Sequence, residues 1–210
     1  MKNVDKSRSI PSARSAVRHL RAVDPVLAHV IARVGPCTLT PKSDDTFAAL
    51  LQSIVYQQLN GKAAATIHAR VMKVLGGEAT PRRLNKTPDA PLRAAGLSAN
   101  KLAAIRDLTE KCLSGAVLPR RNLERLSDTE IIEILTAVRG IGEWTAQMFL
   151  MFRLGRPDVL PSGDFGVRKA FGRLYRKNGR MPPPSALEKH GRLWAPHRTV
   201  ASWYLWRSLD

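Results

Sequence analysis

The chain has 210 residues, enough for one domain or two small lobes with a buried core. Lysine and arginine number 34 against 17 aspartates and glutamates, and the resulting net charge of +17 favours a polyanionic partner such as nucleic acid. No apolar run approaches the ~20 residues that span a bilayer, and no helix pattern sets a basic face against a wholly apolar one, so we expect no membrane partner.

Cysteine usage points to a reducing compartment. Only Cys37 and Cys112 occur, no CxxC pair is present, and the five histidines show no metal-binding spacing. We therefore expect two structural thiols and no metal site. No apolar core of a secretory signal follows the first residues, which favours a cytoplasmic protein.

Residues 1–20 are rich in arginine, lysine and serine. We predict a basic, disordered arm that adds non-specific DNA affinity, with a transit peptide or a merely solubilising segment as alternatives. The fold is expected to begin near Leu20, with a short helix through Asp24-Pro25 to Val34 that Gly35-Pro36 ends.

A strongly amphipathic helix follows Asp44-Asp45. Its last turn runs into the uncharged polar cluster Gln57-Gln58, with Gly61 available for a left-handed cap. Amide side chains suit contact with a base edge because they donate and accept hydrogen bonds, although two solvated glutamines beside a loop are equally expected. The apolar residues recur at helical spacing: Phe47, Leu50, Leu51, Ile54 and Val55.

The stretch from Ser127 to Phe152 predicts a helix, a tight turn and a second helix. Ser127 and Glu130 form a capping box at the start of the first helix. Gly140 and Gly142 permit positive φ and leave the backbone uncovered, so the next helix presents bare amides at its positive end. Such an end is suited to bind phosphate. Beyond it the sequence is apolar nearly all round, which predicts a buried helix.

Asp164 stands in front of a third helix that is rich in cations, including Arg168. An aspartate that precedes a helix is most often an N-cap, and its carboxylate lies at the positive end of the helix dipole. The cationic side chains around Asp164 are suited to bind phosphate groups. We therefore treat Asp164 both as a cap and as a candidate catalytic group, since the two roles are compatible.

The residues 138–146, VRGIGEWTA, resemble the helix-hairpin-helix motif of the DNA glycosylase superfamily. Asp164, 22 residues after Gly142, stands where that family keeps its catalytic aspartate. The pattern of the bacterial 3-methyladenine DNA glycosylase II type continues through Leu160-Pro161, Asp164-Phe165 and the stretch 194–198, WAPHR. The resemblance covers roughly residues 20–208.

The resemblance implies an all-α fold of two helical lobes with an active-site cleft between them. The central lobe would span residues 45–155 and contain the hairpin at about 127–153. The second lobe would combine residues 21–44 with 158–210 and carry the catalytic aspartate. The chain is too short for the additional N-terminal sheet domain of some relatives, and its first 40 residues show no strand-like alternation.

The resemblance further implies a base-excision-repair enzyme that flips a damaged nucleotide out of double-stranded DNA and hydrolyses its N-glycosidic bond. Asp164 would stabilise positive charge on C1′ and O4′ or orient the attacking water. Alkylated purines of the 3-methyladenine and 7-methylguanine type suit a site with one carboxylate, because they already carry positive charge and leave without protonation. Trp144 stands where strand-cutting relatives hold a lysine, so no lyase activity is expected.

Two groups of residues are predicted to meet the DNA. Aromatic faces attract a cationic base, although Met148 and the C-terminal aromatics are also explained by core packing. The predicted base pocket comprises Trp144, Phe165, Trp206, Tyr56 and Met148, and the resemblance implies the roles of Phe165 and Trp206, which match pocket positions of the resembling enzyme. The predicted DNA-binding residues are Arg139, Gly140, Ile141, Gly142, Thr145, Gln57, Gln58, Lys101 and Arg168.

No cofactor is expected. The iron–sulfur cluster of the endonuclease III branch needs four cysteines, which this chain does not have. A monovalent cation held by hairpin carbonyls occurs in the family. For His197-Arg198 we prefer packing or a phosphate contact to a catalytic role. We expect a monomer associated with the nucleoid of a bacterial cell.

The alternative functions are a non-enzymatic helix-hairpin-helix DNA-binding protein and a glycosylase for deaminated or mismatched bases.

Overall fold

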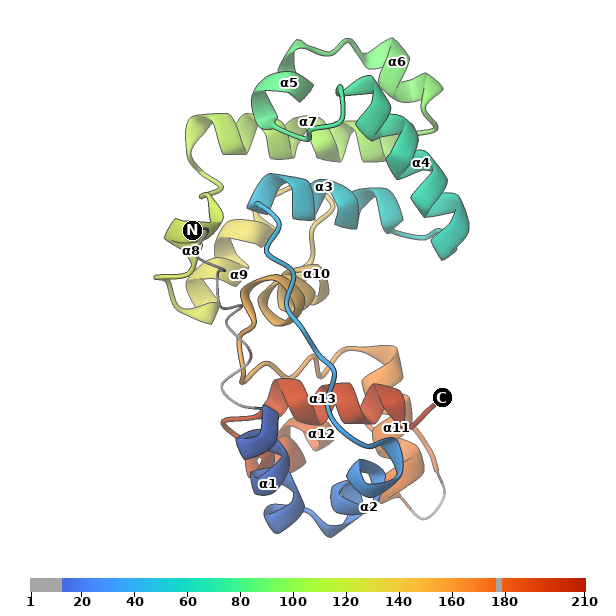
Figure 1. Ribbon diagram of the computed structural model, residues 1–210, viewed down its shortest axis with the longest axis vertical. Helices are drawn as coiled ribbons and strands as arrows, with labels where there is room; N and C mark the ends of the chain where they lie inside the picture. The colour runs from blue at the N-terminus through green and yellow to red at the C-terminus, as the bar shows by residue number, and fades with distance from the viewer. Residues whose placement is uncertain (1–12, 177–178) are drawn as a thin grey trace, which may run out of the picture. The chain divides into compact units, whose positions relative to one another are not determined.

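A computed structural model describes residues 13–176 and 179–210, which form helices joined by turns and loops and contain no strand (Figure 1). The predicted all-α class is confirmed. Contacts divide the chain into two compact units. One comprises residues 43–149, and the other joins the residues up to Lys42 with those from Leu150 onward. Within the described ranges, no helix is long and apolar enough to cross a membrane.

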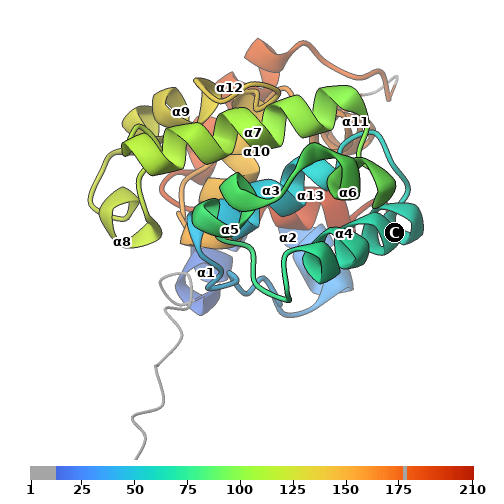
Figure 2. The ribbon, with the colours of Figure 1, turned by 90° about the horizontal axis from the view of Figure 1, so that it is seen from above.

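The unit of residues 43–149 is built on the packing of α3 against α7, whose buried faces include Leu50, Ile54 and Leu108. Figure 2 shows the short helices α5 and α6 lying along α7, which they also contact. The helices of this unit are α3 (Thr46–Tyr56), α4 (Gly61–Val74), α5 (Pro81–Lys86), α6 (Asp89–Ala94), α7 (Ala99–Ser114), α8 (Arg120–Leu123), α9 (Asp128–Thr136) and α10 (Glu143–Phe149).

In the other unit, α13 packs against α1, α2 and α11, and its Val200, Tyr204 and Leu205 are fully buried. The apolar stretch that follows α10 is a π-helix rather than a continuation of the α-helix. The elements of this unit are α1 (Ala13–Val23), α2 (Pro25–Val34), the π-helix η1 (Leu150–Leu154), α11 (Phe165–Tyr175), α12 (Pro184–Gly191), the 3₁₀ turn η2 (Arg192–Trp194) and α13 (Arg198–Arg207).

A buried carboxylate ties four of these elements together. Asp24 is the N-cap of α2, only 2% exposed, and accepts a hydrogen bond from the Leu27 amide at 2.9 Å. It also accepts from the Tyr175 hydroxyl at 2.8 Å, the Trp194 indole at 2.8 Å and the His190 ring at 3.0 Å. Burial alone raises the pKa of Asp24, but these hydrogen bonds outweigh it and hold the pKa far below its usual range.

The prediction of a disordered arm is wrong for residues 13–20, which belong to α1. Ala16 and Leu20 lie one helical turn apart on the same face and are fully buried. Arg14, Arg18 and Arg21, in the same stretch, hid this apolar face in the sequence. Residues 1–12 of the predicted arm lie outside the described residues.

Candidate active site

The hairpin forms as its sequence predicts. Ser127 and Glu130 make the reciprocal capping-box bonds that begin α9. Gly140 adopts a φ of +77°, the left-handed region that favours glycine. Gly142 does not adopt positive φ, and a Cβ added there would meet no atom within 4 Å. The fold of this unit therefore does not require a glycine at position 142.

Two hydrogen bonds and one buried side chain hold the hairpin against the rest of its unit. The Arg139 amide donates to the Asp107 carboxylate at 2.7 Å, the Gln57 side-chain amide donates to the Gly140 carbonyl at 2.9 Å, and Ile141 is 4% exposed. Burial raises the pKa of Asp107, but hydrogen bonds from Lys111 and from the Arg139 amide lower it overall. The side chain of Arg139 is exposed.

The turn after α3 carries local strain. Gln58 has a φ of +57°, a left-handed conformation that costs a residue with a side chain about 1–2 kcal/mol. The expected left-handed cap at Gly61 is wrong, because Asn60 caps α4 by accepting from the Ala63 amide and Gly61 is already helical. Leu59, which the sequence analysis did not single out, is 40% exposed beside the strained residue.

A cavity of about 590 Å³ brings most of the predicted residues of this unit together. The sequence analysis missed Ser53, although its spacing from Tyr56 and Gln57 places it on their face of α3. Tyr56 also packs edge-on against His68, with ring centroids 6.1 Å apart. The cavity is lined by Ser53, Tyr56, Gln57, Gln58, Gly140, Trp144, Thr145 and Met148.

Trp144 corrects one expectation about α10. The helix is not buried all round, since the Trp144 side chain is 50% exposed and Met148 is partly exposed, while Thr145 and Phe149 face the interior. An exposed indole on the wall of a cavity loses apolar burial that a core position would give. The Trp144 indole therefore gives only part of its area to packing, and the rest is accessible at the cavity wall.

Asp164 is the N-cap of α11, as its position in the sequence predicts. Its Oδ1 accepts a hydrogen bond from the Val167 amide at 2.7 Å and a second from the indole Nε1 of Trp206 at 2.9 Å. The cap bond comes from α11 and the indole from α13. The structure thus brings together Asp164 and Trp206, two of the predicted site residues.

Three further predicted residues are not among those that line this cavity: Phe165, Lys101 and Arg168. Phe165 is 65% exposed, with the Lys169 ammonium 5.8 Å from its ring centre. The Lys101 ammonium donates to the Val55 carbonyl at 2.7 Å, and burial lowers its pKa. Arg168 donates through Nε and Nη2 to the Pro182 carbonyl. DNA contact by Lys101 and Arg168 stays a prediction.

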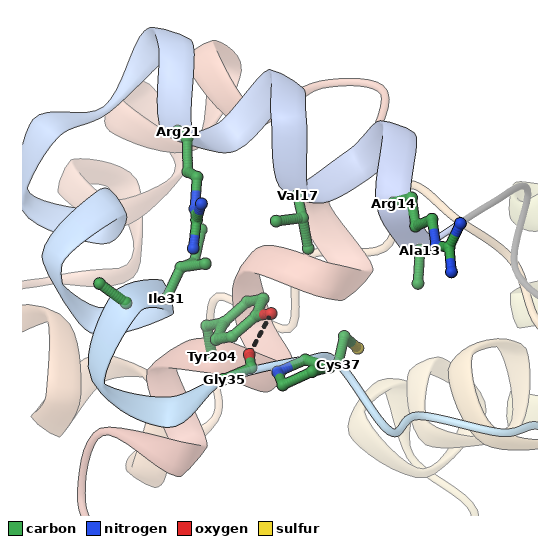
Figure 3. A pocket seen from close by; sticks show the side chains of 10 residues that line it. Ala13, Arg14, Val17, Arg21, Ile31, Gly35, Cys37 and Tyr204 are labelled. Atoms are coloured by element: carbon green, nitrogen blue, oxygen red, sulfur yellow. Dashed lines mark hydrogen bonds between the residues drawn. The ribbon is translucent and has the colours of Figure 1, made fainter.

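A second cavity, of about 710 Å³, lies among α1, α2 and α13 and is lined in part by Arg14, Arg21 and Cys37 (Figure 3). The hydroxyl of Tyr204 donates to the Gly35 carbonyl at 2.9 Å, and burial raises the pKa of Tyr204 to about 12. Burial also raises the pKa of Cys37. No carboxylate is among its described lining residues, so this cavity offers no anion for catalysis.

Trp194 and Arg198 of the WAPHR stretch make contacts within the protein. The Trp194 indole is the buried donor to Asp24, and Arg198 forms a two-pronged ion pair with Asp158, at 2.7 and 2.8 Å. Both cysteines are free thiols, and burial raises the pKa of Cys112 to about 12. Across the described part of the chain, no group of three histidine, cysteine or acidic side chains is placed to hold a metal ion.

The family model of the HhH-GPD superfamily base excision DNA repair proteins matches residues 51–196, and the chain belongs to this family. DNA-3-methyladenine glycosylase 1 of Schizosaccharomyces pombe is 32% identical over 97% of this chain and 91% of its own. The crystal structure of DNA-3-methyladenine glycosidase from Bacillus halodurans has 41% identity and a TM-score of 0.85, covering 95% of this chain and 90% of that one.

The S. pombe 3-methyladenine DNA glycosylase solved in complex with abasic DNA has 33% identity and a TM-score of 0.81, covering 92% of this chain and 95% of its own. DNA-3-methyladenine glycosylase 2 of Escherichia coli is 25% identical over 79% of this chain and 58% of its own. The recognised family and its fold are thereby confirmed.

Proposed function

We propose that this protein is a base-excision-repair DNA glycosylase that removes alkylated purines of the 3-methyladenine and 7-methylguanine type. The observation that carries the proposal is the cavity beside the hairpin, in which the exposed indole of Trp144 faces the same space as Tyr56 and Met148. A cationic base over an indole gains roughly 0.5–2 kcal/mol, which a neutral base of the same shape does not gain.

The chemistry requires an anion near the sugar. The C1′–N bond breaks, the bonding pair leaves with the cationic base and neutralises it, and water adds to C1′ and gives up a proton. Asp164 stabilises the positive charge that builds on C1′ and O4′ or orients the water. No group is needed to protonate the departing base, because alkylation has already supplied its positive charge.

The enzyme is monofunctional in this proposal. An indole has no amine with which to form a Schiff base at C1′, and Trp144 occupies the place of the lysine in strand-cutting relatives. The product is an abasic site in an intact strand. Gln58 and Gln57 are proposed to contact the bases left in the duplex, and Gln58 is the better placed because Gln57 already donates to Gly140.

The protein is proposed to act as a monomer on chromosomal DNA in a bacterial nucleoid. A monovalent cation at the hairpin is compatible with its backbone: the Gly140 carbonyl accepts one hydrogen bond, from Gln57, and a carbonyl oxygen has two lone pairs. Such a cation would add positive charge next to a phosphate.

Hairpin contact with DNA predicts the effect of Gly142→Ala. The added methyl meets no protein atom within 4 Å, so the variant should keep the wild-type unfolding midpoint. The methyl would stand between the hairpin backbone and a phosphate, and the loss of a hydrogen bond to a charged group should weaken binding by about tenfold to 100-fold. Fluorescence anisotropy should show equal weakening for lesion-bearing and intact duplexes, because phosphate contacts carry no sequence information. Unchanged affinity would contradict hairpin contact at Gly142.

A substrate panel tests the function itself. Wild-type protein should release 3-methyladenine and 7-methylguanine from methylated duplex DNA and leave strands that break only after alkali treatment. Borohydride should trap no covalent protein–DNA species. Release of uracil, hypoxanthine or oxidised purines instead would indicate another lesion class. Tight binding without any release would indicate a non-enzymatic DNA-binding protein.

A further inference from the structure

The carboxylate of Asp164 is held from two directions. The Val167 amide, on the same helix, donates to Oδ1 at 2.7 Å, which is the usual N-cap bond. The Trp206 indole, 42 residues further along the chain, donates to the same oxygen at 2.9 Å. A cap bond alone leaves a carboxylate broad rotational freedom about its last torsion. A second donor on a different helix restricts that rotation.

Gly166 makes room for this second donor. A Cβ at Gly166 would lie 3.0 Å from Cδ1 and 3.1 Å from Nε1 of Trp206, and 3.2 Å from Oδ1 of Asp164. These distances are tighter than nine in ten real Cβ contacts. Gly166 does not have positive φ, so its conformation does not demand glycine. What demands glycine here is the close approach of the indole to the carboxylate.

The indole itself is well supported. Its ring lies against that of Phe152, with centroids 5.9 Å apart and planes 31° from parallel. Trp206 sits in the last turn of α13, whose Tyr204 and Leu205 are fully buried. The ring therefore has a packed neighbour and a buried helix behind it, and its N–H edge is directed at Asp164.

We propose that Trp206 and Gly166 are positioning residues for Asp164: the indole N–H holds the carboxylate in its catalytic orientation, and the missing side chain at Gly166 allows it to do so. The proposal rests on the catalytic role of Asp164 proposed above. It assigns the N–H edge of Trp206, rather than its ring face, to the reaction. A carboxylate that is free to turn is misplaced for much of the time, and displacements of about 1 Å can cost about 100-fold in rate.

Trp206→Phe is the decisive variant because it keeps an aromatic ring and removes the N–H donor. We expect single-turnover base release to fall by about tenfold or more, with unchanged affinity for a non-cleavable lesion analogue. Trp203→Phe, on the same helix, is the matched control and should keep the wild-type rate. A Trp206→Phe variant that loses affinity but keeps its rate would overturn the proposal, since the ring would then be a pocket wall only.

Gly166→Ala tests the second part of the proposal, that the missing side chain at Gly166 allows the indole to reach the carboxylate. It should lower the rate about as much as Trp206→Phe, and the two changes together should cost little more than either alone, because both remove the same hydrogen bond. Full additivity would overturn the coupling. Unfolding midpoints of all variants are measured in parallel.

An NMR measurement tests the hydrogen bond between Trp206 and Asp164 independently of catalytic activity. In ¹⁵N-labelled protein, the indole N–H of Trp206, assigned from its absence in Trp206→Phe, should exchange slowly with solvent in wild type. It should exchange faster in Asp164→Ala and Gly166→Ala. Equal exchange in all three proteins would overturn the proposal. If wild-type protein releases no alkylated base, the proposed function fails. If Asp164→Asn retains base release, the catalytic role of Asp164 fails; if it does not, and both positioning variants retain the wild-type rate, only this inference fails.

Discussion

Asp164→Asn is expected to lower base release from methylated DNA by at least about 100-fold, the usual cost of removing one electrostatic group from a transition state. Asparagine caps a helix about as well as aspartate, and it can still accept from the Val167 amide and the Trp206 indole. The substitution therefore removes the negative charge while keeping the shape and the local fold.

Single-turnover release and lesion binding are the measurements. The rate should fall while affinity for lesion-bearing DNA stays within about a few-fold of wild type, because the charge acts mainly in the transition state. Asp45→Asn is a matched control, since Asp45 also caps a helix, by accepting from the Phe47 amide at 3.2 Å. Base release by Asp164→Asn near the wild-type rate would rule out a catalytic carboxylate at this position.

Asp24→Ala is expected to destabilise the protein by about 3–5 kcal/mol. The change removes the N-cap of α2 and leaves the Tyr175 hydroxyl and the buried Trp194 N–H without their acceptor. A loss of this size is a large share of the roughly 5–15 kcal/mol that a native domain has. Urea unfolding measures it, and Asp210→Asn, at an exposed ion pair, should stay within about 0.5 kcal/mol of wild type.

The same carboxylate predicts a pH dependence of stability. Because the pKa of Asp24 is lowered in the folded state, its stabilisation is fully present above the unfolded value of about 3.9 and is lost as the pH falls toward the folded pKa. The unfolding free energies of wild type and Asp24→Asn should therefore converge below about pH 4. A difference that stays constant through this range would mean that the charge of Asp24 contributes nothing.

Local patterns carried most of what the sequence predicted. The capping box at Ser127, the positive φ at Gly140 and the cap at Asp164 all depend on a few neighbouring residues, and all three are present. The cavity residues were identified because Tyr56 and Gln57 end one helix and Trp144 begins another beside the recognised hairpin. Short-range chemistry of this kind can be read directly from a sequence.

Contacts between residues far apart in the chain could not be predicted from the sequence. The sequence analysis gave Asp24 no role beyond the helix predicted through Asp24-Pro25, because its partners Tyr175, His190 and Trp194 come from the other end of the chain. The bond from Trp206 to Asp164 likewise depends on how α13 packs on α11. Residues 13–20 were mistaken for an arm because the burial of Ala16 and Leu20 depends on neighbours that their own segment does not specify.

The two partly buried thiols have a consequence for a protein whose substrate is alkylated DNA. Electrophiles attack thiolates much faster than thiols, and partial burial lowers the small thiolate fraction of Cys37 and Cys112 further by raising their pKa values. The cysteines of this chain are therefore poor targets for the same reagents that damage its substrate. Under alkylation stress, modification of these two thiols should therefore be slow compared with that of an exposed cysteine.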